Sequence, residues 1–210
     1  NGIPSGFQNS VIALANVFVQ SNINAFGKMA MAGCGSYSKI EGFVFLPVTC
    51  FNMALTTFVS QNLGAKQYDR AKKGAWFGIL CSMSIAELIG FAIYAVSPVL
   101  IAAFNSDPEV VHYGVMQAKT ISLFYCVLAF SHCIAAVLRG SGNASVPMVV
   151  MLCVWGLFRV SYITVAVHFI PDIRMVFWAY PLTWSISSVI FLYLFLRGKW
   201  IYGFEKNAKT

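Results

Sequence analysis

The stretch AWFGILCSMSIAELIGFAIYAVSPVLIAA, residues 75–103, decides the fold. Its only charged side chain is Glu87. At about 1.5 Å of rise per residue, a helix of this length crosses the roughly 30 Å hydrocarbon core of a membrane. A run this apolar and this long therefore predicts a transmembrane helix.

Similar stretches lie on both sides of it along the chain. Hydrophobic residues make up 59% and charged residues 10% of the sequence, whereas soluble domains carry roughly 45–50% and about 25%. Too few charges remain to cover a soluble surface. The sequence predicts an all-α integral membrane protein, a single six-helix bundle over residues 1–210. The expected helices are residues 5–26, 42–63, 75–103, 115–138, 148–170 and 175–197.

The basic residues divide unevenly between the predicted loops on the two sides. Six crossings put both termini on one side, with nine basic residues there and three on the other. The positive-inside rule then predicts cytoplasmic termini, and the net charge of +7 indicates membrane topology and contact with anionic lipid, not nucleic acid. The larger set is Lys66, Arg70, Lys72, Lys73, Arg139, Arg197, Lys199, Lys206 and Lys209, and the smaller is Lys28, Lys39 and Arg174.

The first predicted helix carries amides in place of the expected apolar residues. On a helical wheel most of them fall on one stripe, which lipid would penalise. Bonding between helices and lining a substrate cavity both explain such a stripe, and its density here favours the cavity. The candidates are Gln8, Asn9, Asn16, Gln20 and Asn24. The second helix has a weaker stripe, for which both explanations stay open: Thr49, Asn52, Thr56 and Ser60.

Two ionisable residues lie near the middle of predicted helices. Glu87 is the candidate for proton coupling, because a transporter needs a group that binds and releases protons within the membrane. The alternative is a fixed ion pair with Arg159, which lies at a comparable depth in the fifth helix. Arg159 itself is expected to be that partner or a structural anchor, since a guanidinium does not titrate in proteins.

The remaining candidates are expected to be structural. Lys119 can extend its ammonium group to the membrane surface, and His132 is expected to be hydrogen-bonded. Trp178, Tyr180 and Trp184 are expected at the membrane interface, with stacking against a substrate as the alternative. A break at Tyr180-Pro181 is expected in the last helix. The six cysteines are expected to be reduced and packed in the bundle. No metal-binding spacing, and hence no metal site or cofactor, is predicted.

Enzyme and channel functions find little support in the motifs. Gly140-Ser141-Gly142 is similar to a nucleophile turn but falls in a predicted loop, and neither an HExxH motif nor paired intramembrane aspartates occur. A TVGYG-like filter and an arginine-rich voltage-sensing helix are also missing from the sequence. The chain is expected not to be an enzyme.

Four fragments carry a family resemblance along nearly the whole chain. They are GIPSGFQNSVIALANVFVQSNINAFG (2–27), IEGFVFLPVTCFNMALTTFVSQNLGA (40–65), RAKKG (70–74) and LRGSGNASVPM (138–148). In this order they resemble the carboxy-terminal six-helix lobe of bacterial multidrug and toxic compound extrusion (MATE) transporters.

The resemblance implies one lobe of a twelve-helix, two-lobed transporter in a bacterial plasma membrane. Such a protein exports cationic or amphipathic compounds in exchange for H⁺ or Na⁺ by alternating access. Some members carry acidic residues on the first helix of this lobe, whereas this chain has only amides there. The resemblance therefore places the coupling carboxylate in the amino-terminal lobe or at Glu87.

Two alternatives stay open from the sequence. A flippase for lipid-linked precursors has a related two-lobed fold, and its cavity would be broader and more basic. Six helices could also form a complete chain that works as a homodimer. The opening Asn-Gly-Ile-Pro, without an initiator Met or a signal peptide, favours a piece of a longer protein.

Overall fold

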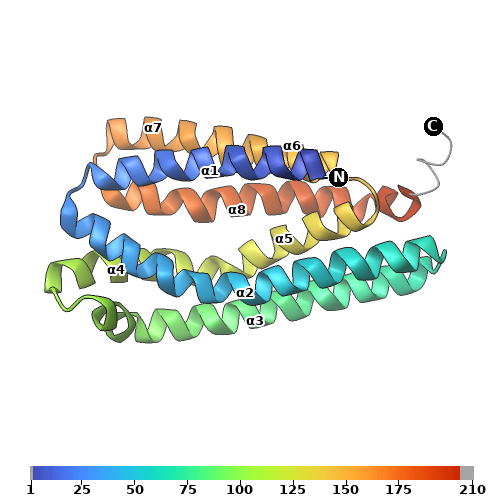
Figure 1. The fold of residues 1–210 in the computed structure, drawn as a ribbon, viewed down its shortest axis with the longest axis horizontal. Coiled ribbons are helices and arrows are strands. Elements are labelled where there is room, and N and C mark those ends of the chain that lie inside the picture. The colour runs from blue at the N-terminus through green and yellow to red at the C-terminus, as the bar shows by residue number, and fades with distance from the viewer. Residues whose placement is uncertain (1, 204–210) are drawn as a thin grey trace.

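The computed structural model describes the backbone of residues 2–203 and the side chains from Gly6 onward. This part of the chain forms six long helical segments joined by short loops (Figure 1). They are α1 (Gly2–Asn24), α2 (Lys28–Gly64), α3 (Tyr68–Phe104), α4 (Pro108–Ile121) continuing through η1 (Ser122–Phe124) into α5 (Tyr125–Gly140), α6 (Ser145–Met151) continuing through η2 (Leu152–Phe158) into α7 (Arg159–Phe169), and α8 (Ile173–Leu196). A short helix, η3 (Lys199–Tyr202), follows.

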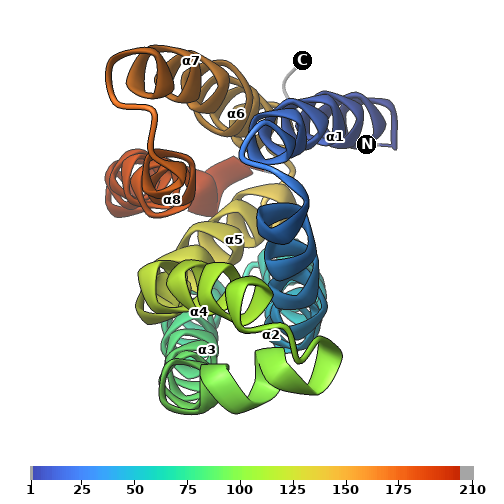
Figure 2. The same cartoon turned by 90° about the vertical axis from the view of Figure 1, so that its left-hand side faces the viewer.

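The helices form two groups. One contains α1, α6, α7 and α8, and the other contains α2, α3, α4 and α5 (Figures 1 and 2). The largest apolar core centres on α2, α3 and α5, around residues such as Tyr37, Ile79 and Leu128, and extends into the first group through α8. A smaller core joins α1, α7 and α8 around Val19, Ile163 and Phe177. The two groups therefore share apolar contacts, chiefly where α8 packs against α5 and α4.

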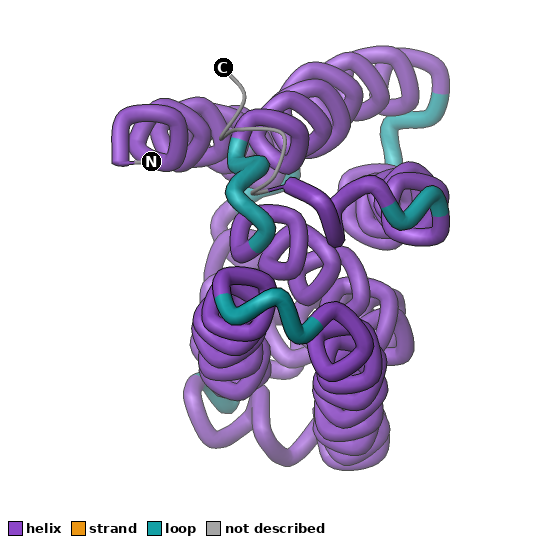
Figure 3. The backbone as a smooth tube through the Cα atoms, turned by 90° about the vertical axis from the view of Figure 1, so that its right-hand side faces the viewer, coloured by secondary structure: helices purple, strands orange, loops and turns teal. Residues whose placement is uncertain are grey.

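The loops alternate between the two ends of the bundle, as six crossings require. The loops after α2 and α5 lie at the end where α1 begins, and the loops after α1, α3 and α7 lie at the other (Figures 1 and 3). This arrangement agrees with the predicted sorting of the loops, whereas the orientation in a membrane stays a prediction. Lys206 and Lys209 lie outside the described residues.

Helix α2 is longer than the sequence predicted. The expected outer loop between residues 27 and 41 is helical from Lys28 onward. Residues 28–41 contain no proline, and Gly33 allows α2 to approach α4 closely. A Cβ atom at Gly33 would lie 2.6 Å from the Val110 carbonyl oxygen. The loop prediction was wrong because polar residues here face a neighbouring helix or a cavity, not a water-exposed turn.

Three other helices differ from the prediction in their continuity. The segment from Pro108 to Gly140 changes to a 3₁₀ turn at Ser122–Phe124, and the one from Ser145 to Phe169 is π-helical over Leu152–Phe158. Helix α8, in contrast, runs straight through Pro181, so the predicted break is not present. Proline is tolerated within membrane helices when neighbouring groups satisfy the freed backbone carbonyl.

Five of the helical segments within residues 2–203 are long and apolar enough to cross a membrane. Helix α1 falls short on composition because of its amides, although it lies alongside the other five (Figure 1). Its polar side chains therefore need a protein or water environment.

The close contact between α2 and α4 is tested by a pair of glycine substitutions. Gly33→Ala should lower the thermal unfolding temperature of the purified full-length protein, since overpacking costs about 1–3 kcal/mol and the new Cβ would meet backbone atoms of α4.

Gly35→Ala is the matched control, because its Cβ would meet nothing within 4 Å. It should leave the unfolding temperature unchanged or raise it, as alanine favours a helix interior over glycine. Equal unfolding temperatures for the two variants would contradict the packing described here.

Candidate substrate cavity

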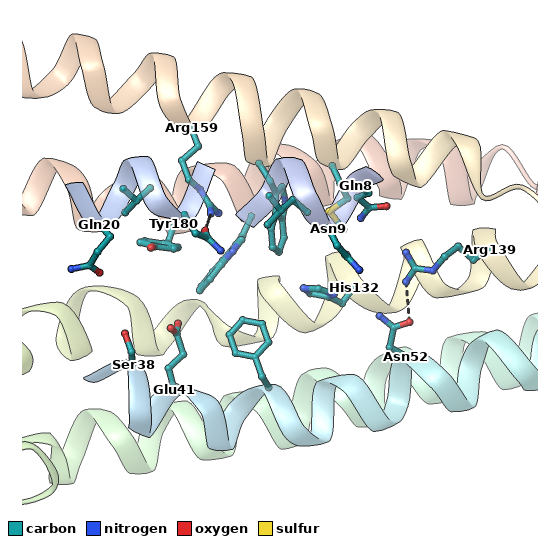
Figure 4. A pocket seen from close by; sticks show the side chains of 17 residues that line it. Gln8, Asn9, Gln20, Ser38, Glu41, Asn52, His132, Arg139, Arg159 and Tyr180 are labelled. Carbon is teal, nitrogen blue, oxygen red and sulfur yellow. Dashed lines mark hydrogen bonds between the residues drawn. The ribbon is translucent and has the colours of Figure 1, made fainter. Parts of the chain in front are cut away.

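A cavity of about 600 Å³ lies between the two helix groups. Each surrounding helical segment presents one stripe of side chains to it (Figure 4). The stripes come from α1, α2, α5, α8 and the segment α6–α7. Residues three, four or seven apart share a face of a helix, which explains why each stripe points one way.

The amides of α1 form the first wall. Four of the five candidates line the cavity, namely Gln8, Asn9, Asn16 and Gln20. Asn24 does not line it and accepts a hydrogen bond from Gln20 Nε2 at 2.8 Å. The predicted stripe thus borders a cavity, and the binding of a substrate there stays a prediction.

The wall from α2 contains Ser38, Glu41, Phe45 and Asn52. Of the second predicted polar stripe only Asn52 lines the cavity. Thr56 instead donates to the Ala136 carbonyl at 3.3 Å and joins α2 to α5. Glu41 was expected in an outer loop, and the extension of α2 to Lys28 places it inside the helix. The spacing of 3, 4 and 7 residues along this wall was the signal that could have identified it.

Arg159 connects three helical segments at one end of the cavity. Its side chain is only 2% exposed. It donates to Thr183 Oγ1 of α8 at 2.9 Å and to Asn16 Oδ1 of α1 at 3.5 Å. Its guanidinium also lies over two aromatic rings, 4.6 Å from the Tyr180 centroid and 5.4 Å from that of Trp155. These contacts are those expected of a structural anchor, and that role of Arg159 stays a prediction.

The predicted ion pair between Glu87 and Arg159 is wrong. Glu87 lies on α3, outside the cavity lining, and accepts a hydrogen bond from the backbone N–H of Cys126 at 3.1 Å. The 3₁₀ turn η1 comes just before Cys126, and amides in the first turn of a helix have no helical acceptor. A carboxylate is favoured at this position. Glu87 thus caps the start of α5.

Glu41 is the acidic residue that faces Arg159. It is the single carboxylate among the described residues that line the cavity. Arg159 acts on it electrostatically, and the Tyr37 hydroxyl lies within hydrogen-bonding reach. Tyr37 in turn shares a hydrogen bond with the Tyr125 hydroxyl of α5. The hydroxyls beside the carboxylate thus belong to its own helix group, and Arg159 acts on it from the other group through its charge.

The opposite end of the cavity contains Arg139 and His132 of α5 (Figure 4). Arg139 donates to Asn52 Oδ1 at 2.9 Å. The His132 ring lies edge-on to Phe45 and Trp155, with centroid distances of 6.3 and 5.1 Å. Its Nε2 atom is buried without a hydrogen-bond partner. The expected hydrogen bond of His132 is therefore not present at Nε2.

The aromatic residues of α8 divide between two environments. Trp178 is exposed and packs edge-on against Phe124 at 5.7 Å, as an interfacial residue would. Tyr180 and Trp184, however, line the cavity, and Trp184 is 1% exposed. The interfacial prediction is wrong for these two because depth along a helix does not reveal which way a side chain points.

The other candidates lie away from the cavity. Lys119 is exposed on α4, with its ammonium 5.6 Å from the centre of the Tyr94 ring. All six cysteines are free, and two of them, Cys34 and Cys133, are buried. Within residues 2–203 no group of three or more potential metal ligands gathers.

An apolar helical bundle with a cavity of about 600 Å³, lined by both polar and aromatic side chains, is compatible with a membrane transporter. Residues 4–165 match the model of the MatE family. The chain belongs to this family, whose members are multi-pass membrane transporters.

Curated relatives carry multidrug-resistance names. The chain is 24% identical to the probable multidrug resistance protein YoeA of Bacillus subtilis over 191 residues, which are 90% of this chain and 41% of YoeA. It is 26% identical to the probable multidrug resistance protein NorM of Thermotoga maritima over 213 residues, 99% of this chain and 44% of NorM. The chain thus spans less than half the length of these relatives.

Solved structures share the fold. A MOP superfamily transporter from Pyrococcus furiosus aligns with a TM-score of 0.84 at 17% identity, covering 91% of this chain and 42% of its own. A MATE transporter in complex with MaD3S aligns with a TM-score of 0.85 at 17% identity, covering 91% and 43%. The predicted fold, one six-helix lobe of a MATE transporter, is confirmed.

Cysteine labelling tests whether water and soluble reagents reach the cavity. In a cysteine-free version of the full-length protein, Asn16→Cys should react with a charged, membrane-impermeant thiol reagent, because Asn16 faces the cavity. Leu14→Cys is the matched control, since Leu14 lies on a different face of α1 and is 69% exposed. Labelling at position 14 that equals labelling at position 16 would contradict a polar cavity beside α1.

Proposed function

We propose that the protein carrying this chain exports amphipathic compounds, including cationic ones, across a bacterial plasma membrane. In this proposal the chain forms the carboxy-terminal lobe, and an amino-terminal lobe of the same protein completes the machine. Both ends of the chain face the cytoplasm, following the excess of basic residues in the loops at that end. Multidrug-resistance names among relatives that match 90% or more of the chain support this function.

The proposed mechanism is secondary active antiport with H⁺ or Na⁺ by alternating access. The two lobes rock against one another and expose the substrate site to either side of the membrane in turn. The observation that carries the coupling is the lone carboxylate, Glu41, in a cavity of drug-like size. A carboxylate there can hold a proton or Na⁺ in one state and a cationic substrate group in the other.

Glu41 is proposed as the coupling residue ahead of Glu87, which stays the second candidate. Glu41 borders the cavity beside Arg159, whereas Glu87 is engaged in a hydrogen bond with the start of α5. A group that exchanges a proton or Na⁺ for substrate must be reachable from the substrate site. The lipid-precursor flippase gains no support from the relatives described above.

A pair of conservative substitutions tests the coupling. In proteoliposomes of the full-length protein, Glu41→Gln should reduce transport of ethidium, driven by an imposed H⁺ or Na⁺ gradient, about tenfold or more. The reason is that the amide keeps the shape of the side chain but cannot carry the exchanged charge.

Glu87→Gln is the matched control, because its amide oxygen can still accept the hydrogen bond from Cys126 N–H. It should retain gradient-driven transport. Loss in Glu87→Gln together with full activity in Glu41→Gln would transfer the coupling role to Glu87. Full activity in both variants would contradict coupling within this lobe.

A further inference from the structure

The charges around the cavity do not match a site for cations alone. Two guanidinium groups, Arg139 and Arg159, line it against the single carboxylate of Glu41. Arg159 is buried and Arg139 is partly buried, and placing two such cations beside one anion is unfavourable unless another group supplies negative charge or hydrogen-bond acceptors. The cavity lining thus has an unmatched positive charge.

Unpartnered polar atoms in the cavity wall also call for an acceptor. Arg159 Nε and Trp184 Nε1 can only donate hydrogen bonds, and both are buried without a partner. His132 Nε2 is buried without a partner as well and donates when it carries the proton. Buried donors are normally satisfied, so three unpartnered atoms in one cavity wall are unusual, and only the His132 atom belongs to the Arg139 end of the cavity.

Two of the aromatic rings that line the cavity already face a cation. A cationic group can bind the face of a tryptophan or tyrosine ring. Here the Arg159 guanidinium lies over both Trp155 and Tyr180, at 5.4 and 4.6 Å from their centroids. The carboxylate available to a cationic substrate is Glu41, at the Arg159 end of the cavity.

The two ends of the cavity differ in charge (Figure 4). Glu41 lies at the end with Arg159, whereas Arg139, His132 and Asn52 lie at the other. Glu41 and Asn52 are eleven residues apart on α2, which is about 16 Å of helix rise. At the Arg139 end no acidic side chain among the described residues lines the cavity, and the one recorded partner of the Arg139 guanidinium is the Asn52 amide oxygen.

We propose that the Arg139 end is a binding subsite for the anionic group of a substrate, such as a carboxylate, sulfonate or phosphate. Arg139 supplies the charge and a planar pair of donors suited to such groups. His132 and the amides of Gln8 and Asn9 supply further donors, and Phe45 and Trp155 provide apolar walls for the adjoining ring. This subsite rests on the proposed transport function. It extends the expected substrates from cationic compounds to anionic compounds and to zwitterions, which carry one charge of each sign.

The size of the cavity favours a compact ligand. About 600 Å³ accommodates a drug-sized molecule and not a lipid with its acyl chains. The Arg139 end is close to the loop between α5 and α6, on the side that the charge distribution predicts to be cytoplasmic. An exporter takes up its substrate from that side.

Two xanthene dyes of similar shape and opposite charge test the subsite. Binding of anionic fluorescein and cationic rhodamine 6G to the purified full-length protein is measured by fluorescence polarisation at fixed pH and salt. Arg139→Gln should weaken fluorescein binding about tenfold or more and change rhodamine 6G binding less than about threefold. Glu41→Gln should do the reverse.

Two further variants separate charge from folding. Arg139→Lys keeps the charge and should retain much of the fluorescein affinity. Lys72→Gln removes an equal charge from the exposed start of α3 and should leave both affinities unchanged. If Arg139→Gln unfolds at a lower temperature, its weaker binding does not show whether Arg139 contacts the anionic dye. Fluorescein binding by Arg139→Lys and the opposite selectivity of Glu41→Gln then test the subsite.

The outcomes distinguish this inference from the transport function on which it rests. Binding of rhodamine 6G without fluorescein, or equal weakening of both dyes in Arg139→Gln with a normal unfolding temperature, overturns the anion subsite and leaves the transport proposal standing. Failure of the full-length protein to bind or transport either dye contradicts both.

Discussion

The buried guanidinium of Arg159 is the interaction on which the cavity depends. A charge removed from water is tolerated only when hydrogen bonds and opposite charge replace its hydration. Arg159 meets this requirement with Thr183 of α8, Asn16 of α1, the faces of Trp155 and Tyr180, and the field of Glu41 across the cavity. These contacts orient α1, α7 and α8 relative to one another. The polar space of the cavity lies between these helices and the walls formed by α2 and α5.

Irregular backbone places the functional side chains around this space. The π-helical turn at Leu152–Phe158 precedes Arg159 and contains Trp155, and such turns often occur at functional sites. The 3₁₀ turn at Ser122–Phe124 starts a new helix at Tyr125, from which His132 and Arg139 face the cavity. The same turn creates the free amide that Glu87 caps. Glu87 therefore stabilises the junction before α5, whereas Glu41 faces the cavity.

Periodicity and hydropathy predicted the architecture because both are local properties of the chain. The lengths of the apolar stretches predicted six helices. The spacing of the amides on α1 predicted the cavity wall that Gln8, Asn9, Asn16 and Gln20 form. The start of α2 was missed because its small and polar residues are typical of a loop, and this error moved Glu41 out of the membrane region. No local pattern could place Glu87 beside Cys126, since that contact depends on a break between α4 and α5 that neither proline nor glycine marks. Nor does sequence depth distinguish Trp184, which points inward, from Trp178, which points outward.

The central claim is that substrate binds inside this lobe, between α1 and α5. The most direct measurement is a cryo-electron microscopy map of the full-length protein with a transported dye bound. The account predicts density for the dye within the cavity, between Trp155 and Arg139. Density confined to the space between the two lobes, with the cavity beside Arg159 holding water alone, would contradict it.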